Sequence, residues 1–163
     1  MLKDQDRIFT NLYGMHERTL KGAKARGHWD GTAALIKKGR DWIIDEMKAS
    51  GLRGRGGAGF PSGVKWEMVY KYVNDVKYVV CNGDEGDPGA FMDRMLMESY
   101  PFRVIEGIII AAFVVGADEG RVYIRSEYPL ATKRMREALE KCRANGFLGE
   151  NILFSGFSLT LEI

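Results

Sequence analysis

Apolar residues form blocks whose period changes along the chain, and each change predicts a new element. Tyr78–Cys81 is a short apolar run, Val104–Val115 is a long and largely apolar stretch, and Arg121–Arg125 is again short. Short runs rich in β-branched and aromatic residues predict strands, and the long stretch, which follows Pro101, predicts a buried helix. Strand, helix and strand are therefore expected in that order.

A second helix and a third strand follow the same logic. Pro129 is expected to open the helix and Asn145-Gly146 to end it. Its apolar face is made by residues spaced four, three and four apart: Ala131, Met135, Ala138 and Cys142. Phe157–Ile163 alternates apolar and polar residues, which is the period of a strand. Alternating strands and helices predict an α/β fold with a mostly parallel sheet.

The first 72 residues are patterned more weakly. Residues 1–28 are polar and predict an N-terminal arm with short helical pieces. Three helices are expected after it, reaching Lys38, over Trp42–Ala49 and around Val64–Tyr72. Asp30 and Asp41 are the expected N-caps of the first two, and Gly39 is expected to end the first. The second is expected to turn three side chains inward, those of Trp42, Ile43 and Met47.

The pattern divides the chain into residues 1–72, an arm with helices and a glycine-rich loop, and residues 73–163, which hold the sheet. The chain stops at Ile163 inside the last expected strand. We therefore expect an N-terminal portion of a longer protein with an incomplete, truncated sheet.

Composition narrows the function classes. The 24 basic and 22 acidic residues leave a net charge of +2, so no strong field for polyanions is expected. Basic residues are not interleaved with aromatic ones, and nucleic-acid binding is not expected. The longest apolar run, Ile108–Val115, is too short to cross a bilayer. Two cysteines, Cys81 and Cys142, cannot hold an iron–sulfur cluster alone and suit a reducing cytoplasm.

A glycine-rich segment, Gly51–Trp66, is the first candidate for chemistry. Six of its sixteen residues are glycine, and Arg53, Arg55 and Lys65 add positive charge. Exposed amides in such a loop form a concavity that binds anions, which predicts a cradle for a phosphate-bearing cofactor. Residues 54–59 match G-x-G-x-x-G, but a helix rather than a strand is expected before them, so this is not a standard dinucleotide fingerprint. A glycine-rich linker is the alternative.

An acidic loop, Asn82–Gly89, is the second candidate. It follows a strand's carboxyl end, where α/β sheets place their ligands. Carboxylates such as Asp84 and Asp87 accept hydrogen bonds from sugar hydroxyls, and Asn82 can both donate to and accept from a heteroaromatic ring. A calcium loop and a solvated turn are the alternatives, although EF-hand spacing is absent. His16 and His28 have no partners at ligand spacing and are expected to be structural or on the surface.

Taken together, Gly51–Trp66 and Tyr78–Arg94 resemble the NADH-binding flavoprotein subunit of respiratory complex I. That family includes the diaphorase subunits of NAD(P)-linked hydrogenases and formate dehydrogenases. The resemblance extends over nearly the whole chain. Asp6–Gly14 is similar to the complex I branch, and Asp84–Arg94 looks more like the hydrogenase and formate dehydrogenase branch. Complex I subunits usually carry Glu where this chain has Asp87.

The resemblance implies a Rossmann-like sheet that binds FMN at its end and stacks NADH on it. The implied chemistry is hydride transfer from NADH to FMN and onward electron flow to iron–sulfur clusters of a quinone-reducing complex. A [4Fe–4S] cluster is expected only beyond residue 163. Within residues 1–163, neither a metal site nor a catalytic side chain is expected. The implied cofactor-binding residues are Gly54, Arg55, Gly56, Gly57, Ala58, Gly59, Phe60, Pro61, Ser62, Gly63, Lys65, Asn82, Asp84 and Asp87. Asp87 is implied to tune the flavin.

The implied partners are other subunits of a redox complex, including an iron–sulfur subunit. The complex is expected on the cytoplasmic side of the inner membrane without insertion into it. Alternatively, the chain belongs to a soluble cytoplasmic hydrogenase or formate dehydrogenase. Two further hypotheses are a non-catalytic assembly module and an unrelated nucleotide-sugar or phosphate-binding enzyme. With half of an FMN site, residues 1–163 alone are expected to be inactive.

Overall fold

The structure is a computed structural model that describes residues 17–163. The helical pieces expected before residue 17, the similarity over Asp6–Gly14 and His16 lie outside the described residues. The elements are α1 (Leu20–Ala25), α2 (Thr32–Lys38), α3 (Arg40–Ala49), α4 (Ser62–Lys71), β1 (Tyr78–Gly83), α5 (Met92–Ser99), α6 (Pro101–Val115), β2 (Glu119–Ile124), α7 (Pro129–Ala144), the 3-10 turn η2 (Ile152–Phe154) and β3 (Thr160–Glu162).

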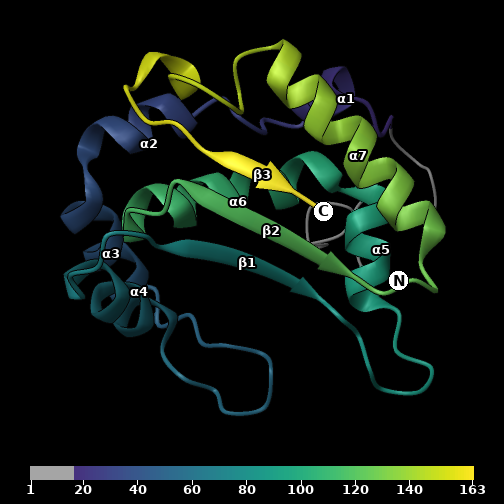
Figure 1. Ribbon diagram of the computed structural model, residues 1–163, viewed down its shortest axis with the longest axis horizontal. Coiled ribbons are helices and arrows are strands. Elements are labelled where there is room, and N and C mark those ends of the chain that lie inside the picture. Colours follow the sequence, from purple (N-terminus) through teal and green to yellow (C-terminus); the bar gives the residue numbers. More distant parts are fainter. Residues whose placement is uncertain (1–16) are drawn as a thin grey trace.

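A three-stranded parallel sheet of order β1-β2-β3 organises the described chain (Figure 1). Tyr78 is paired with Glu119, and Glu119 with Thr160, so each crossover returns the chain to the same end of the sheet. The α/β class and the parallel sheet predicted from the sequence are confirmed.

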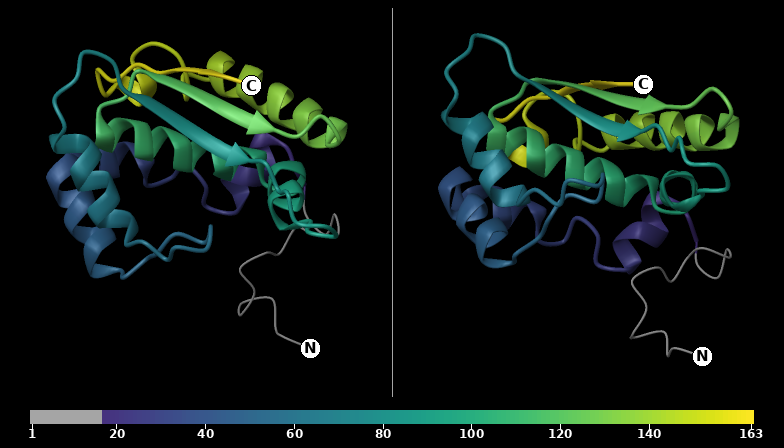
Figure 2. Two further views of the ribbon diagram at one scale, coloured as in Figure 1. Left: turned by 60° about the horizontal axis from the view of Figure 1, so that its bottom comes forward. Right: turned by 90° about the horizontal axis from the view of Figure 1, so that it is seen from below.

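Helices cover one face of the sheet. Figure 2 shows α6 and α7 beneath it, while the opposite face carries no helix of the described chain. The strands alternate accordingly: Val122 and Leu161 are buried, whereas Tyr78, Val80 and Tyr123 are 57 to 60% exposed. The face of the sheet opposite the helices is therefore exposed, and the side chains of β1 and β2 that point to it include Tyr78, Val80 and Tyr123.

Local sequence explains the two long helices. Pro101 and Pro129 occupy first-turn positions, where a missing N–H costs nothing. Gly116 ends α6 in the left-handed conformation, with φ of 76°, and its amide donates to the Ala112 carbonyl. The apolar faces of both helices join one core, which includes Ile105, Ile109, Met135 and Cys142.

Several local predictions were wrong. Gly31 and Gly39, rather than Asp30 and Asp41, occupy the N-cap positions of α2 and α3, and neither helix has a side-chain cap. Gly39 does end α2, as expected. Trp42 is exposed rather than inward, and its ring packs against the Lys38 ammonium, which lies 3.7 Å from the ring centroid.

Two elements differ in extent. β3 begins at Thr160 rather than Phe157, because the Leu159 amide donates to Gly149 instead of to the sheet. α5 was not predicted at all. His28 is buried, and burial lowers the pKa of its imidazole, which fits a structural role. The division of the chain at residue 72 stays a prediction. Across that boundary, α6 packs on both α3 and α4.

No helix among residues 17–163 has the length and apolar character needed to cross a membrane.

Candidate functional site

The glycine loop, residues 51–61, is closed at its base by hydrogen bonds. Gly54 N donates to Phe60 O over 2.9 Å, and Ser62 N donates to Leu52 O over 2.9 Å. The Arg53 guanidinium donates to the Gly59 carbonyl over 2.9 Å, so this cation is used inside the loop. Only Arg55 and Lys65 remain of the three cations expected to attract a phosphate.

Backbone donors of the loop are available. Within the described chain, no amide from residue 55 to residue 59 donates to a protein acceptor. Gly57 and Gly59 adopt φ of 97° and 59°, which residues with a side chain rarely adopt. A Cβ on Gly56 would meet nothing within 4 Å, so open space faces the loop. These features are those of an anion-binding loop.

A groove of about 610 Å³ separates the glycine loop from β1. Its size falls in the ordinary range for small-molecule sites. Seven of the expected residues line it: Gly54, Gly56, Ala58, Gly59, Phe60, Ser62 and Lys65. Trp66, Tyr78 and Val80 supply an aromatic and aliphatic wall. Lys65 is exposed in the first turns of α4, and its ammonium makes no ion pair with the described residues.

Other expected residues do not line the groove. Arg55 and Gly57 lie exposed in the same loop, and Pro61 lies at its base, bridged to Arg53. Gly63 is buried against α3, so close packing of the two helices explains why it has no side chain. Its contact with a cofactor stays a prediction.

The acidic loop begins where β1 ends. Asp84 N donates to Asn82 Oδ1 over 2.8 Å, which forms a local turn. The Asp87 carbonyl accepts from Ala90 N over 3.1 Å, with Gly89 at φ of 77°. Asn82, Asp84 and Asp87 are all exposed, beyond the residues that line the groove. Both loops lie on the β1 side of the sheet in Figure 1.

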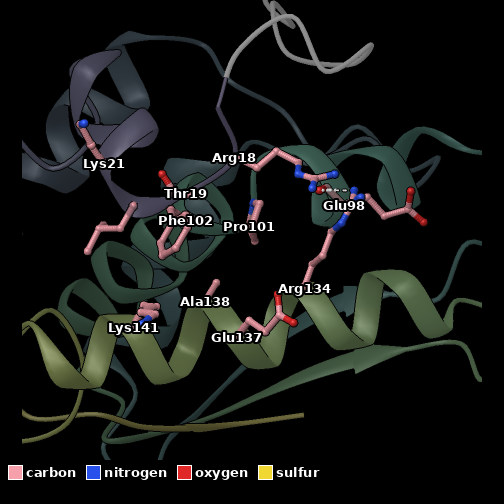
Figure 3. Close-up of a pocket in the computed structure, with 11 residues that line it drawn as sticks. Arg18, Thr19, Lys21, Glu98, Pro101, Phe102, Arg134, Glu137, Ala138 and Lys141 are labelled. Carbon is pink, nitrogen blue, oxygen red and sulfur yellow. Dashed lines mark hydrogen bonds between the residues drawn. The ribbon is translucent and has the colours of Figure 1, made fainter.

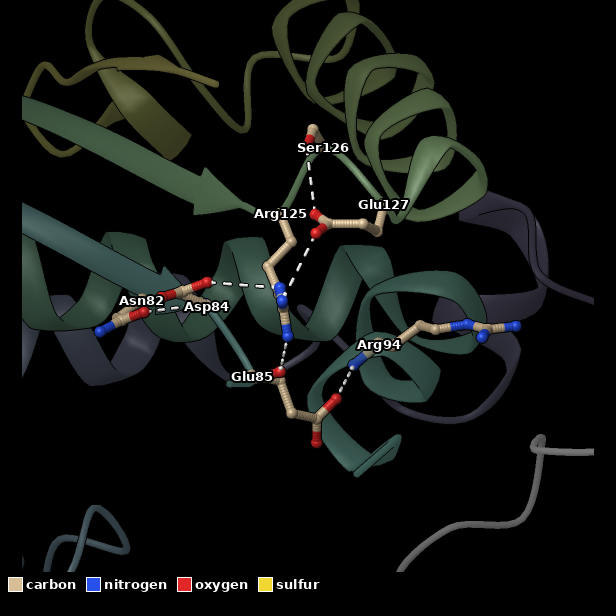
Figure 4. Close-up of polar contacts among 7 residues, drawn as sticks. All are labelled: Asn82, Asp84, Glu85, Arg94, Arg125, Ser126 and Glu127. Carbon is tan, nitrogen blue, oxygen red and sulfur yellow. Dashed lines mark hydrogen bonds and ion pairs between the residues drawn. The ribbon is translucent and has the colours of Figure 1, made fainter. Parts of the chain in front are cut away.

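Glu85, which sequence reasoning did not single out as a site residue, anchors this loop. Its carboxylate is buried and accepts from Asp93 N over 3.0 Å and from Arg94 N over 3.3 Å, at the N-terminus of α5 (Figure 4). A carboxylate in this position satisfies amides that lack a partner inside the helix. Burial, followed by the nearby Glu85 charge, raises the pKa of Asp93.

Arg125 was also missed. It follows the last residue of β2 and reaches the acidic loop, with Nη1 2.6 Å from the Glu85 carbonyl oxygen and Nε 3.7 Å from Asp84 Oδ1. Its contact depends on the parallel register, in which Ile124 pairs with Gly83, and no local sequence pattern signals that register.

A second cavity, of about 390 Å³, lies between α1, α7 and the junction of α5 with α6 (Figure 3). Arg18, Glu98, Phe102 and Arg134 are among the residues that line it, and Arg134 donates to the Glu98 carbonyl over 2.8 Å. None of the fourteen expected residues lines it. Residues 17–163 contain no group of three His, Cys, Asp or Glu side chains placed to hold a metal ion.

The residues of the groove fit a cofactor that combines a phosphate with a flat ring. The free amides and Lys65 suit the anion, and Phe60, Trp66 and Tyr78 suit the ring. FMN has both parts, so the donor set and the aromatic lining agree with this cofactor.

Comparison with known proteins agrees with this geometry. Residues 47–162 match the model of the Nuo51 FMN-binding domain. The chain is 51% identical to a NADH-quinone oxidoreductase subunit of Rhodobacter capsulatus, covering 100% of this chain and 38% of that protein. It is 47% identical to the mitochondrial NADH dehydrogenase [ubiquinone] flavoprotein 1 of Dictyostelium discoideum, covering 99% of this chain and 34% of the relative.

Among solved structures, a chain of the NAD⁺-reducing [NiFe]-hydrogenase in the H₂-reduced state superimposes with a TM-score of 0.68 at 35% identity. That match covers 82% of this chain and 21% of the hydrogenase chain. The chain thus spans well under half the length of these relatives. With a family model matched over most of its length and a fold that agrees, the chain belongs to the Nuo51 FMN-binding domain family.

Proposed function

We propose that the protein containing this chain binds FMN and NADH and takes a hydride from NADH onto FMN. The electrons then pass to iron–sulfur clusters of a larger quinone-reducing complex. When bound, the flavin supplies the redox chemistry, because it accepts a hydride and gives up electrons singly. The observation that carries the proposal is the groove, which combines the free amides of the glycine loop and the Lys65 ammonium with an aromatic wall.

Each residue has a proposed part. Gly54, Gly56 and Lys65 would contact FMN: the free Gly56 amide and the Lys65 ammonium complement the charge of its phosphate, whereas Gly54, whose amide closes the base of the loop, offers open surface without a side chain. Asn82 and Asp84 would hydrogen-bond to its polar ring and ribityl groups. The residues proposed near NADH are Gly57, Phe60, Lys65 and Asp87. The remaining residues of the run from Gly54 to Gly63 would shape the loop.

The chain's own role is therefore to bind and orient the two cofactors and to exclude water from between them. The closed base of the glycine loop limits how far its amides can move, which lowers the entropy cost of binding. The exposed Tyr78 and Val80 offer apolar surface that a ring would remove from water. No general base is needed, because the hydride moves between the two cofactors.

The relatives favour quinone over other acceptors. The relatives that are 50 to 51% identical over the aligned region are NADH-quinone oxidoreductase subunits, whereas the hydrogenase chain is 35% identical. We therefore place the protein in a peripheral assembly with an iron–sulfur subunit. Function as the diaphorase of a soluble hydrogenase is the second candidate, favoured by the structural match.

The test uses the full-length protein purified with its native partner subunits. After incubation with FMN and gel filtration, we expect flavin absorbance that coelutes with the protein and bleaches when NADH is added without oxygen. Quinone reduction by NADH would support the first candidate, and H₂-dependent NAD⁺ reduction the second. A preparation that retains no flavin contradicts the proposal.

A further inference from the structure

We propose that Arg125 is a positioning residue that fixes the backbone of the acidic loop beyond β1, so that Asp84 and Asp87 are held where a ligand meets them. The expected effect on FMN binding rests on the proposed function. The effect on the order of the acidic loop rests only on contacts within the chain.

The parallel register brings Arg125 to the loop. Ile124 pairs with Gly83 at the carboxyl ends of β2 and β1, so the residues that follow, Arg125 and Asp84, leave the sheet side by side. Neighbouring strands lie about 5 Å apart. Arg125 can therefore reach the acidic loop although about 40 residues of chain separate them.

Its guanidinium contacts three acceptors at once. Nη1 donates to the Glu85 carbonyl over 2.6 Å, Nε lies 3.7 Å from Asp84 Oδ1, and Nη2 lies 3.4 Å from Glu127 Oε1 (Figure 4). A planar fork of five donors can serve these directions together, whereas the ammonium of lysine is a single point charge.

Glu85 is consequently held at both ends. Its carbonyl accepts from Arg125, and its carboxylate accepts from the Asp93 and Arg94 amides of α5. The loop between β1 and α5 is thus tied to β2 on one side and to a helix on the other. Asp87 lies in this tied loop. Its carboxylate is exposed and makes no ion pair with the described residues, so it is available to a ligand.

Without the cation, the loop would lose its tie to β2. Asp84 and Glu127 would lose the positive charge between them. The hydrogen bonds that the Glu85 carboxylate accepts from α5 do not by themselves define the path of residues 84–87, since they hold only the side chain.

The test measures hydrogen exchange in the full-length protein without added cofactor. For Arg125→Ala, we expect the hydrogen-bonded amides in residues 84–94, those of Asp84, Ala90, Asp93 and Arg94, to exchange about tenfold faster or more, because a charged hydrogen bond is lost. The amides of α6 should be unchanged. Arg121→Ala is the matched control: Arg121 lies in β2, four residues before Arg125, but it pairs with Glu119 and Glu162. It should leave residues 84–94 unaffected.

FMN binding gives the second measurement. Arg125→Ala should raise the FMN dissociation constant about tenfold with little change in melting temperature. The dissociation constant of Arg125→Lys should lie between those of the wild type and Arg125→Ala. Unchanged exchange in residues 84–94, or acceleration that spreads equally to α6, overturns the positioning role. Because exchange is measured without cofactor, it decides this role even if the wild-type protein retains no FMN, a result that would overturn the proposed function instead.

Discussion

Gly63, at the start of α4, lies directly against the backbone of Lys48 near the end of α3. A Cβ on Gly63 would come within 2.6 Å of the Lys48 amide nitrogen and 2.9 Å of the Met47 carbonyl carbon. The two helices therefore approach each other as closely as they do only because this position has no side chain. Since they flank the glycine loop, their contact also sets the separation of the loop's two ends.

Replacing Gly63 with alanine should destabilise the fold. Overpacking of this kind costs about 1–3 kcal/mol, and here the obstacle is backbone that cannot rotate away. Chemical denaturation would measure the loss in the free energy of unfolding. Gly56→Ala is the control, because nothing lies within 4 Å of its added Cβ. Equal stability of the two variants would contradict the packing role.

Lys65→Ala should weaken binding of FMN and NADH. The loss expected is about 1.5–3 kcal/mol, the range for a hydrogen bond to a charged group. Titration followed by flavin fluorescence would measure it in the full-length protein. Lys71→Ala, on the same helix but paired with Glu67, is the control and should leave binding unchanged.

Lys65→Arg should recover only part of that affinity, since a planar guanidinium and a compact ammonium fill different shapes. Flavin content and NADH affinity equal to those of the wild type in Lys65→Ala would contradict a role for this lysine in the groove.

Asp87→Asn should raise the midpoint potential of the bound flavin. Reduction that adds negative charge is opposed by a fixed carboxylate, by about 2 kcal/mol at about 8 Å and an effective dielectric of about 20. That energy corresponds to some tens of millivolts for a two-electron couple, and solvent screening makes it an upper bound. We expect slower release of NAD⁺ as well.

A spectroelectrochemical titration would measure the midpoint potential. Asp75→Asn is the control, because Asp75 is exposed in the connection between α4 and β1. No shift, or a shift to lower potential, would reduce Asp87 to a residue of the turn before Pro88.

Acid should weaken the contact between α3 and α4. Hydrogen bonds from Lys48 and then Lys71 lower the pKa of Glu67 to about 2 from 4.5. Because the folded-state pKa is the lower one, the stabilisation is present above pH 4.5 and is lost as the pH falls toward about 2. Glu67→Gln should therefore show a smaller fall in the free energy of unfolding over this interval than the wild type.

Denaturant titrations at several pH values would measure this difference. Glu46→Gln, at an exposed position on α3, serves as control and should follow the wild type. A Glu67→Gln profile parallel to that of the wild type would mean that the bridge to Lys48 and Lys71 contributes nothing to folding.

The sequence predicted elements whose signals are local. Pro101 and Pro129 mark helix starts, Asn145-Gly146 marks a helix end, and the apolar spacing of α7 defines its buried face. α5 escaped prediction because its first amides are satisfied by Glu85, seven residues before the helix begins. Alternation over Phe157–Ile163 reported burial of Leu159 and Leu161, not the length of the paired strand.

The candidate site divides in the same way. Its glycine and acidic loops could be found because glycine and carboxylate patterns are contiguous in the sequence. Arg125 could not be found, since its contact with Glu85 depends on strand register. The use of Arg53 inside the glycine loop and the packing of Gly63 on Lys48 depend on the folded backbone in the same way.

Because the strands are parallel and far apart in the sequence, each one must wait during synthesis for its partner strand to be made. Tyr78 meets Glu119, and Glu119 meets Thr160, so each strand pair closes a loop of about 40 residues, far longer than a hairpin. α6 and α7 lie within these loops and can form from local contacts first. At about 5–20 residues per second, β1 leaves the ribosome some seconds before β2 has been made. During that interval β1 has no partner strand, so its unpaired backbone amides and carbonyls are open to pairing with another chain until β2 arrives.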